Sequence, residues 1–243
     1  AALMEQRLGR AELKRMSAGL VRKQHASVTH MMLAALPVRE VVTTNYDDLF
    51  ELASASLCEV SVLPHGPRPR APRWILKLHG CISDPDSIVL TREDYLRYAQ
   101  GRGALAGIVQ ALLMTRRLLF VGFGLGDDNF HRIADEVRRA SVHGEERFGT
   151  NIVIEDQELQ RQLWRQDLDW ISVKRPGDDL ATAARRLEIF LDRVVAGVDI
   201  APAHLLDPTF EGVLQRGELR LRDALRELGR LLSDPEVRRD APG

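Results

Sequence analysis

Three short apolar stretches that each end abruptly in polar residues constrain the fold of this chain more than any other feature. They are Arg39-Glu-Val-Val-Thr-Thr-Asn-Tyr-Asp-Asp48, Trp74-Ile-Leu-Lys-Leu-His-Gly80 and Leu118-Leu-Phe-Val-Gly-Phe-Gly-Leu-Gly-Asp-Asp-Asn129. Each apolar run is aliphatic or β-branched and too short for a helix, which predicts a buried strand. Ligands of open α/β sheets bind beyond the carboxyl ends of the strands. We therefore expect the polar residues that follow these strands to share one crevice.

Helical stretches alternate with the strands along the chain. We expect helices at residues 5–20, 25–36, 47–57, 101–115, 129–140, 157–166 and 179–195, and further strands at 88–90, 152–154 and 170–173. The run from Thr91 to Asp94 has the form of a capping box that opens a helix. Strands that are apolar throughout indicate a parallel sheet covered on both faces. The pattern therefore predicts an α/β fold with a doubly wound, Rossmann-like parallel sheet.

The strand pattern stops at Asp199, which predicts a division into residues 1–198 and 199–243. In the second part, leucines at helical spacing mark one stripe: Leu221, Leu225, Leu228 and Leu232. This stripe either packs onto the sheet domain or forms a seam for a neighbouring domain or subunit. Residues 199–243 are accordingly expected to be a helical extension, or a linker to a further domain.

Composition excludes several classes of function. Lys plus Arg at 34 against Asp plus Glu at 35 gives a formal charge of −1, so no global field indicates nucleic acid or an anionic membrane. The two cysteines, Cys58 and Cys81, cannot build a four-cysteine zinc site, and the histidines show no ligand spacing. No apolar stretch reaches the roughly 20 residues of a membrane span, and no signal peptide opens the sequence. A cytoplasmic protein without a metal is expected.

Taken together, the three blocks resemble the signature blocks of sirtuin-like domains in bacterial NAD-consuming antiphage-defence proteins. The matching residues are Thr43-Thr-Asn-Tyr-Asp47, Lys77-Leu-His-Gly80 and Phe120-Val-Gly-Phe-Gly-Leu-Gly-Asp-Asp-Asn129, and Ile88-Val-Leu-Thr-Arg-Glu-Asp-Tyr95 is also similar to that branch. The resemblance covers about residues 25–195. It implies that residues 1–198 are an NAD-binding domain that cleaves NAD+ to nicotinamide and ADP-ribose. It also implies partners: further domains of a larger polypeptide, other defence-system subunits or a second copy of the chain.

The resemblance assigns roles position by position. Asn45 would orient the nicotinamide ribose and the attacking water, and His79 would act as the general base. These two are the predicted catalytic residues. The predicted NAD-contacting residues are Thr44, Asn45, Asp47, Gly122, Phe123, Gly124 and Asp127.

Elementary chemistry is compatible with these roles. Nicotinamide in NAD+ is already a cationic leaving group, so the protein needs to hold the ribose and stabilise an oxocarbenium-like centre rather than supply a strong nucleophile. An imidazole can accept a proton near neutral pH, and an amide can orient an oxygen without adding charge. Structural roles remain as alternatives, because Asn45 suits a turn, Asp47 suits a helix cap, and a histidine such as His79 is often only a hydrogen-bonded core residue.

The glycine-rich segment Gly122–Gly126 lacks the G-x-G-x-x-G spacing of a dinucleotide phosphate loop. Asp127 and Asp128 at the start of the next helix would repel a pyrophosphate there, so ribose contact or helix capping fits these acids better.

Departures from the family pattern define two rival functions. Two cysteines make a zinc-dependent protein deacylase the less favoured branch. The family's glycine-rich first strand-to-helix turn, which holds the pyrophosphate, would precede the helix at residue 5 and is not in this sequence. Gly124 stands where the family usually has serine. We therefore expect residues 1–243 alone to turn NAD+ over poorly, and a non-catalytic nucleotide-binding or assembly module is the alternative.

Overall fold

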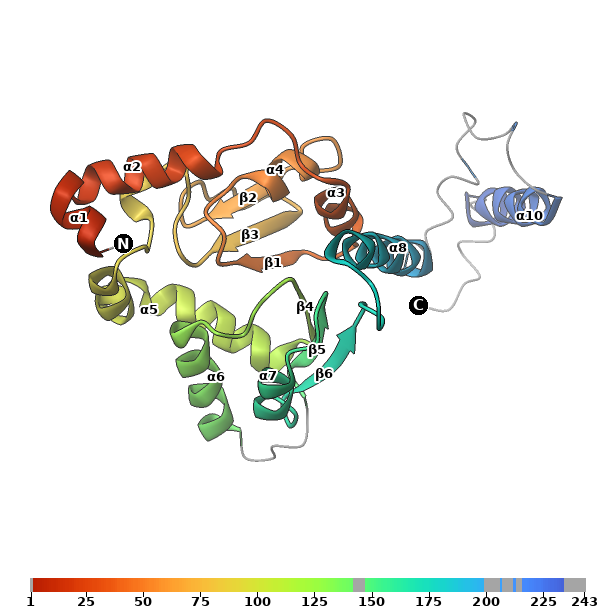
Figure 1. Ribbon diagram of the computed structural model, residues 1–243. Helices are drawn as coiled ribbons and strands as arrows, with labels where there is room; N and C mark the ends of the chain where they lie inside the picture. The colour runs from red at the N-terminus through yellow and green to blue at the C-terminus, as the bar shows by residue number, and fades with distance from the viewer. Residues whose placement is uncertain (1, 142–146, 199–205, 207–211, 213–215, 234–243) are drawn as a thin grey trace. The chain divides into compact units, whose positions relative to one another are not determined.

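Short parallel strands form two three-stranded sheets in the computed structural model, which describes residues 2–141, 147–198, 206, 212 and 216–233 (Figure 1). In the first sheet the order is β1 (Glu40–Thr43), β3 (Arg73–Lys77), β2 (Val60–Leu63). In the second it is β4 (Leu118–Val121), β5 (Gly149–Val153), β6 (Leu168–Ser172). Every pairing within the two sheets is parallel. The predicted parallel α/β fold of Rossmann-like type is confirmed.

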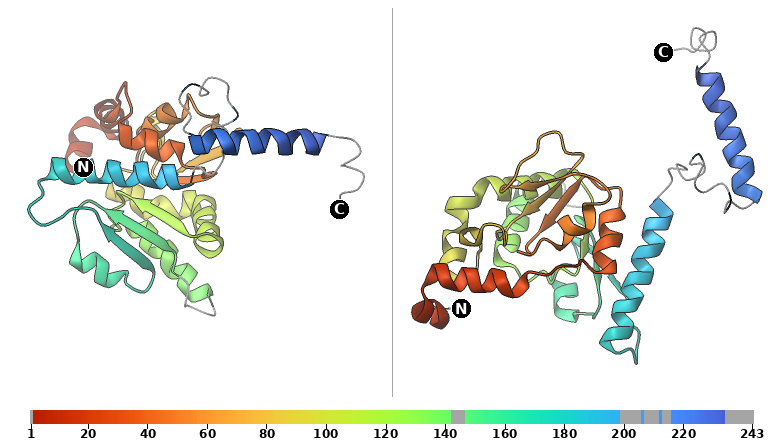
Figure 2. Two further views of the ribbon diagram at one scale, coloured as in Figure 1. Left: turned by 90° about the vertical axis from the view of Figure 1, so that its right-hand side faces the viewer. Right: turned by 90° about the horizontal axis from the view of Figure 1, so that it is seen from above.

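Helices follow the strands as the sequence predicts, except that β2 leads directly to β3. They are α1 (Ala2–Leu8), α2 (Arg10–Val21), α3 (Val28–Ala35), α4 (Leu49–Ser54), α5 (Arg92–Thr115), α6 (Asp128–Ala140), α7 (Glu158–Leu163) and α8 (Leu180–Val198), with a 3-10 turn at Pro85–Ser87. Helices lie on both sides of the strands in the two views of Figure 2. The predicted capping box is present, because the Thr91 side chain accepts from the Asp94 N–H and the Asp94 carboxylate accepts from the Thr91 N–H.

Three local predictions were wrong. Residues 5–20 form two helices rather than one, because the backbone at Gly9 takes φ 79° between α1 and α2. Residues 88–90 are not a strand but a buried loop, held by the Val89 N–H bonding to the His79 carbonyl. The strand Val60–Leu63 was not predicted. Helix α5 joins the helix that the capping box opens to the stretch expected at residues 101–115, and the two meet at a kink at Arg102.

In the part of the chain that the structure describes, the facing edges of the two sheets are not joined by hydrogen bonds between strands. Among the described residues, β1 pairs only with β3, and β4 pairs only with β5, so the other edge of each strand has no strand partner. The central strands β3 and β5 are mostly buried, whereas every residue of β1 is half-buried and Leu119 of β4 is 45% exposed. The hydrogen-bonded sheet is therefore in two pieces.

One hydrophobic core nevertheless joins the two sheets. It combines residues of β3, α5, α6 and β6 with two buried aromatic side chains, Phe148 and Trp164. On the other side, α8 packs against α3 through Leu187 and Leu191, next to Met32 and Leu33. These two contacts fix the strand ends, because they hold both sheets against shared helices.

Residues 196–243 form a second unit of the chain. Helix α10 (Arg216–Ser233) spans the four positions of the predicted leucine stripe, and the first of them, Leu221, is 51% exposed. No helix within the described ranges is long and apolar enough to cross a membrane.

Candidate active site

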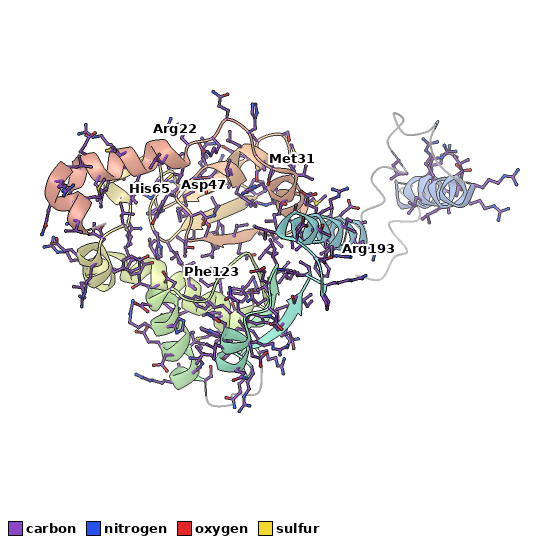
Figure 3. The ribbon with its side chains drawn as sticks, viewed as in Figure 1. Arg22, Met31, Asp47, His65, Phe123 and Arg193 are labelled. Carbon is purple, nitrogen blue, oxygen red and sulfur yellow. The ribbon has the colours of Figure 1, made fainter. Side chains whose placement is uncertain are left out.

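A pocket of about 530 Å³ lies at the carboxyl ends of β1, β3 and β4. Its walls come from the loops that follow these strands, together with Val21 at the end of α2 and Tyr95 in the first turn of α5. Figure 3 labels Asp47 and Phe123, which come from the loops after β1 and β4. All eight residues assigned from sequence line this one pocket: Thr44, Asn45, Asp47, His79, Gly122, Phe123, Gly124 and Asp127.

The loop after β1 is shaped by short polar contacts. The Asn45 N–H donates to Thr43 Oγ1 at 3.0 Å, and Asp47 Oδ1 accepts from the Leu49 N–H at 3.1 Å. Asp47 therefore also makes the structural contact that the sequence allowed, at the start of α4. The Asn45 side chain is exposed and bonds to no described residue, so its amide is available to a ligand in the pocket.

A buried lysine holds this loop in place through a hydrogen bond to its backbone. Lys77, the last residue of β3, is completely buried and donates to the Asp47 carbonyl. Its ammonium also lies 2.6 Å from Glu51 Oε1 and 3.4 Å from the sulfur of Cys81. A buried charge requires such partners, because an unpaired ammonium would carry a large desolvation cost. Lys77 thereby ties the end of one strand to the loop that follows the other.

His79 is held by a loop that permits little movement. Gly80 has φ 99°, and a Cβ built there would lie 2.4 Å from the Ser87 carbonyl oxygen, so only glycine fits. Arg102, at the kink of α5, donates to the carbonyls of Leu78 and Ser87 on either side of this turn. The position of the imidazole is thus set by backbone contacts rather than by a flexible loop.

The loop after β4 presents backbone rather than side chains. Gly122 has φ 65°, and Leu125 has φ 52°, an uncommon conformation for a branched residue. Leu125 is buried, and its carbonyl lies 2.6 Å from Nε2 of His131 on α6. Phe123 stacks on Phe120 and meets Phe130 edge-on, at centroid distances of 6.1 and 5.1 Å. Packing therefore stabilises the unusual backbone of this wall.

Asp127 ends that wall and touches the histidine across the pocket. Its Oδ1 accepts from the Phe130 N–H at 2.8 Å, which caps α6, and its Oδ2 lies 3.1 Å from His79 Nε2. Burial raises the pKa of Asp127, but His79 and the N–H groups of Phe130 and Asn129 outweigh it and hold the pKa below its usual range. The carboxylate is therefore charged at neutral pH. The capping role proposed for this acid is confirmed.

Two tyrosines pack against the histidine and a third lines the same pocket, and no role was predicted for them. Tyr95 and Tyr98 meet the His79 ring edge-on, at 5.5 and 5.8 Å between centroids. Burial, and then the charge of Asp127, raises the pKa of Tyr95 to about 12. Tyr46 donates its hydroxyl to the Val89 carbonyl. Two sequence signals pointed to Tyr95: it ends the run Ile88–Tyr95 that resembles the family branch, and it lies in the first turn after the capping box.

Metal binding finds no support in the described residues. No group of three or more His, Cys, Asp or Glu side chains there could hold a metal ion. Cys81 is buried beside Lys77, and Cys58 lies at the end of the segment after α4. His143 and His204 lie outside the described residues. The absence of zinc stays a prediction.

Comparison with known proteins places these features in a family. The family model described as "SIR2-like domain" matches residues 39–169, more than half of the 243-residue chain. That range contains the three strand-end loops and every residue of the pocket except Val21.

Three curated bacterial proteins show the range of similarity. An NAD(+) hydrolase ThsA of Enterococcus faecium is 34% identical over 122 residues, which are 46% of this chain and 25% of that protein. The defense-associated sirtuin 2 of Bacillus subtilis is 28% identical over 117 residues, 45% of this chain and 12% of that protein. The NAD(+) hydrolase ThsA of Acinetobacter baumannii is 29% identical over 169 residues, 60% of this chain and 34% of that protein. The chain thus matches about a third or less of the length of each.

Proposed function

This chain belongs to the family of SIR2-like domains, and on that premise we propose that its pocket hydrolyses NAD+ to nicotinamide and ADP-ribose. The observation that carries the proposal is the convergence of Asn45, His79 and Asp127, from three separate strand ends, on a single cavity. Two relatives named NAD(+) hydrolase match this chain over 122 and 169 residues, which supports the proposal.

The chemistry assigns a limited task to each side chain. In hydrolysis, the bond from the ribose C1′ to the nicotinamide nitrogen breaks, and its electron pair returns to the nicotinamide ring. A water oxygen bonds to C1′ and loses a proton. The Asn45 amide orients the ribose or that water, and the His79 imidazole accepts the proton. No step requires a nucleophilic side chain or a metal ion from the protein.

The surroundings of His79 suit this reaction. The charged Asp127 lies beside the imidazole and stabilises the imidazolium that forms when the ring accepts a proton. Burial among Tyr95 and Tyr98 excludes bulk water from most of the ring, so the charge pair is weakly screened. Both tyrosine pKa values are raised to about 12, so these hydroxyls stay neutral.

One feature favours the non-catalytic alternative. The lining of the pocket includes the acids Asp47 and Asp127 but no lysine or arginine, so the diphosphate of NAD+ would rely on backbone N–H groups. A pocket with weak diphosphate contacts could bind a smaller nucleoside without turning it over. Binding without release of nicotinamide would be the sign of that alternative.

The wider setting is also a proposal. The names of the relatives associate similar sequences with NAD+ hydrolysis and with defence. We infer that this chain consumes NAD+ as a cytoplasmic effector of bacterial antiphage defence, in concert with further domains or subunits. Self-association of the chain is part of the same proposal.

The test measures nicotinamide release in the intact natural protein that contains this sequence. We expect His79→Ala and Asn45→Ala each to lower turnover on the order of 10²- to 10⁴-fold, the usual contribution of a positioned acid–base or orienting group. His65→Ala is the matched control, since His65 pairs with Asp84 outside the pocket and should leave turnover unchanged.

Thermal unfolding of the same samples separates catalysis from folding. Full activity per folded molecule of His79→Ala would remove the catalytic assignment and leave His79 as a structural residue. Wild-type protein that binds NAD+ without releasing nicotinamide would support the binding module instead.

A further inference from the structure

The environment of His79 distinguishes the two nitrogens of its ring. The residue is 4% exposed, and Nε2 is completely buried against Oδ2 of Asp127. Nδ1 has no hydrogen-bonding partner among the described residues and is not one of the completely buried polar atoms. Since His79 lines the pocket, Nδ1 is the nitrogen left for a ligand.

The ring has little freedom to exchange these positions. Tyr95 and Tyr98 meet it edge-on, and its backbone carbonyl accepts from the Val89 N–H at 2.8 Å. The turn at Gly80 and the Arg102 contacts fix the backbone around it. A rotation that brings Nδ1 to the carboxylate would give up the present edge-on contacts with both tyrosines.

Asp127 is fixed just as firmly, from the opposite sheet. Its side chain is 12% exposed, and Oδ1 is occupied by the N–H of Phe130 at the start of α6. The remaining oxygen, Oδ2, therefore faces the imidazole at a position set by a helix cap. The contact is close but poorly aligned for a hydrogen bond, because the Nε2–H direction misses the oxygen at 3.1 Å.

We propose that Asp127 is a positioning residue: its carboxylate keeps the proton of neutral His79 on Nε2 and so presents Nδ1 to the pocket as the basic nitrogen. A neutral imidazole donates from one nitrogen and accepts at the other, so a fixed acceptor beside Nε2 selects one tautomer. This inference rests on the proposed function and adds a residue to it. It replaces the ribose contact that the sequence assigned to Asp127.

Three roles for Asp127 make different predictions. A positioning residue affects the turnover number, because only the proton-accepting step depends on the tautomer. A ribose ligand chiefly affects KM, because it binds the substrate before and during reaction. A helix cap alone affects stability and neither kinetic constant.

The experiment compares Asp127→Asn with Asp128→Asn in the intact natural protein. Asparagine keeps the size of the side chain and an oxygen for the helix cap, but loses the charge. Asp128 is the next residue, is exposed and lies outside the pocket lining, so its substitution removes the same charge as a matched control.

The first readout does not depend on activity. Nitrogen NMR of histidine-labelled protein, at a pH where the ring is neutral, reports which nitrogen carries the proton, and His79→Gln identifies the signal. We expect Nε2–H in the wild type and in Asp128→Asn, and a gain of the Nδ1–H form in Asp127→Asn. An Nδ1–H tautomer in the wild type would overturn the proposal.

The second readout is the kinetics of NAD+ hydrolysis. We expect Asp127→Asn to lower kcat by about 10²- to 10⁴-fold with little change in KM, the upper limit being the effect of losing the aspartate that sets the tautomer of a catalytic histidine. Asp128→Asn should change neither constant. A normal kcat, or a rise confined to KM, would contradict the positioning role. If wild-type protein releases no nicotinamide, the proposed function fails, while the NMR result still decides whether Asp127 sets the tautomer.

Discussion

The two sheets contribute different kinds of group to the same pocket. The loops after β1 and β3 supply the side chains of Asn45 and His79, whereas the loop after β4 supplies mainly glycine backbone and the single carboxylate of Asp127. In the first sheet, Lys77 at the end of β3 is the centre of a polar network. Next to the second sheet, Phe130 of α6 is the centre of a cluster of aromatic side chains. A buried ion pair therefore supports the loops that present side chains to the pocket. Apolar packing supports the loop that presents mainly backbone.

The central strands show the same contrast in their buried polar residues. Lys77 in β3 and Asn151 in β5 are both completely buried. Lys77 has three partners, Glu51, the Asp47 carbonyl and Cys81. Neither amide atom of Asn151 has a partner among the described residues. One buried polar residue thus serves the site, while the other has no evident structural role.

Replacing Lys77 should cause the largest loss of stability among these variants. We expect Lys77→Met to lower the free energy of unfolding by about 3–5 kcal/mol, because it leaves the carboxylate of Glu51 buried and unpaired. Denaturant unfolding measures the loss. The double variant Lys77→Met with Glu51→Gln removes the unpaired charge and should recover part of it. A single variant as stable as the wild type would show that the ion pair contributes nothing.

Replacing a glycine by alanine should cost more stability in the loop after β3 than in the loop after β4. Gly80→Ala should cost about 3 kcal/mol or more, since it combines a positive φ with a Cβ that meets the Ser87 carbonyl. Gly124→Ala should cost less than about 1 kcal/mol, because nothing lies within 4 Å of its Cβ position. Thermal unfolding of both variants checks this order. Equal losses would mean that the loop after β3 is less constrained than its contacts indicate.

The stability of the fold should depend on pH through Asp94, in the first turn of α5, but not through an exposed acid such as Glu155 after β5. Burial raises the pKa of Asp94, but the N–H groups of Thr91 and Leu90, with Lys14 and Arg10, outweigh it, and the pKa lies well below its usual range. A depressed carboxyl pKa stabilises the fold above the unfolded-state pKa, and this stability is lost as pH falls toward the folded-state value.

We therefore expect Asp94→Asn to lower the free energy of unfolding at pH 7 by about 2 kcal/mol, with the deficit shrinking below about pH 4. Glu155→Gln is the control. The pKa of Glu155 is lowered by Lys174, but its side chain is 58% exposed, so unfolding should be almost unaffected. A deficit for Asp94→Asn that persists unchanged to pH 2 would contradict the linkage.

Asn151 should give the smallest effect, with the opposite sign. Asn151→Val replaces a buried amide without partners by a side chain that favours strands, and we expect a gain of about 1 kcal/mol in the free energy of unfolding. Turnover should be unchanged, since Asn151 lies outside the pocket lining. A loss of stability would show that ordered water satisfies the amide.

Sequence patterns predicted the site better than they predicted its supports. The strand ends were readable because Val41, Ile75 and Leu119 lie in uniformly apolar runs followed at once by polar residues. The pattern failed at Ile88 and Val89, because a buried loop and a buried strand have the same composition. It also missed Val60–Leu63, a strand of four residues beside a proline-rich loop.

Contacts between loops lay beyond what the sequence could predict. The approach of Asp127 to His79 depends on how α6 and β3 share one core, and no local pattern encodes that distance. The same holds for Tyr95, whose direction follows from where the capping box starts α5. Residue types near a site are thus predictable from local chemistry, while their pairing requires the packed fold.

The unpaired edges of β1 and β4 affect how this polypeptide behaves in solution. An open strand edge offers a row of unused N–H and C=O groups to any extended peptide, and natural proteins usually protect such edges with charge, proline or a covering segment. Here Glu40 of β1 pairs with Arg116 just before β4, at 3.7 Å, whereas Val41, Val42 and the exposed Leu119 carry no charge. Among the described residues these two edges have no strand partner, so strand pairing there is a route by which copies of the chain would associate at high concentration.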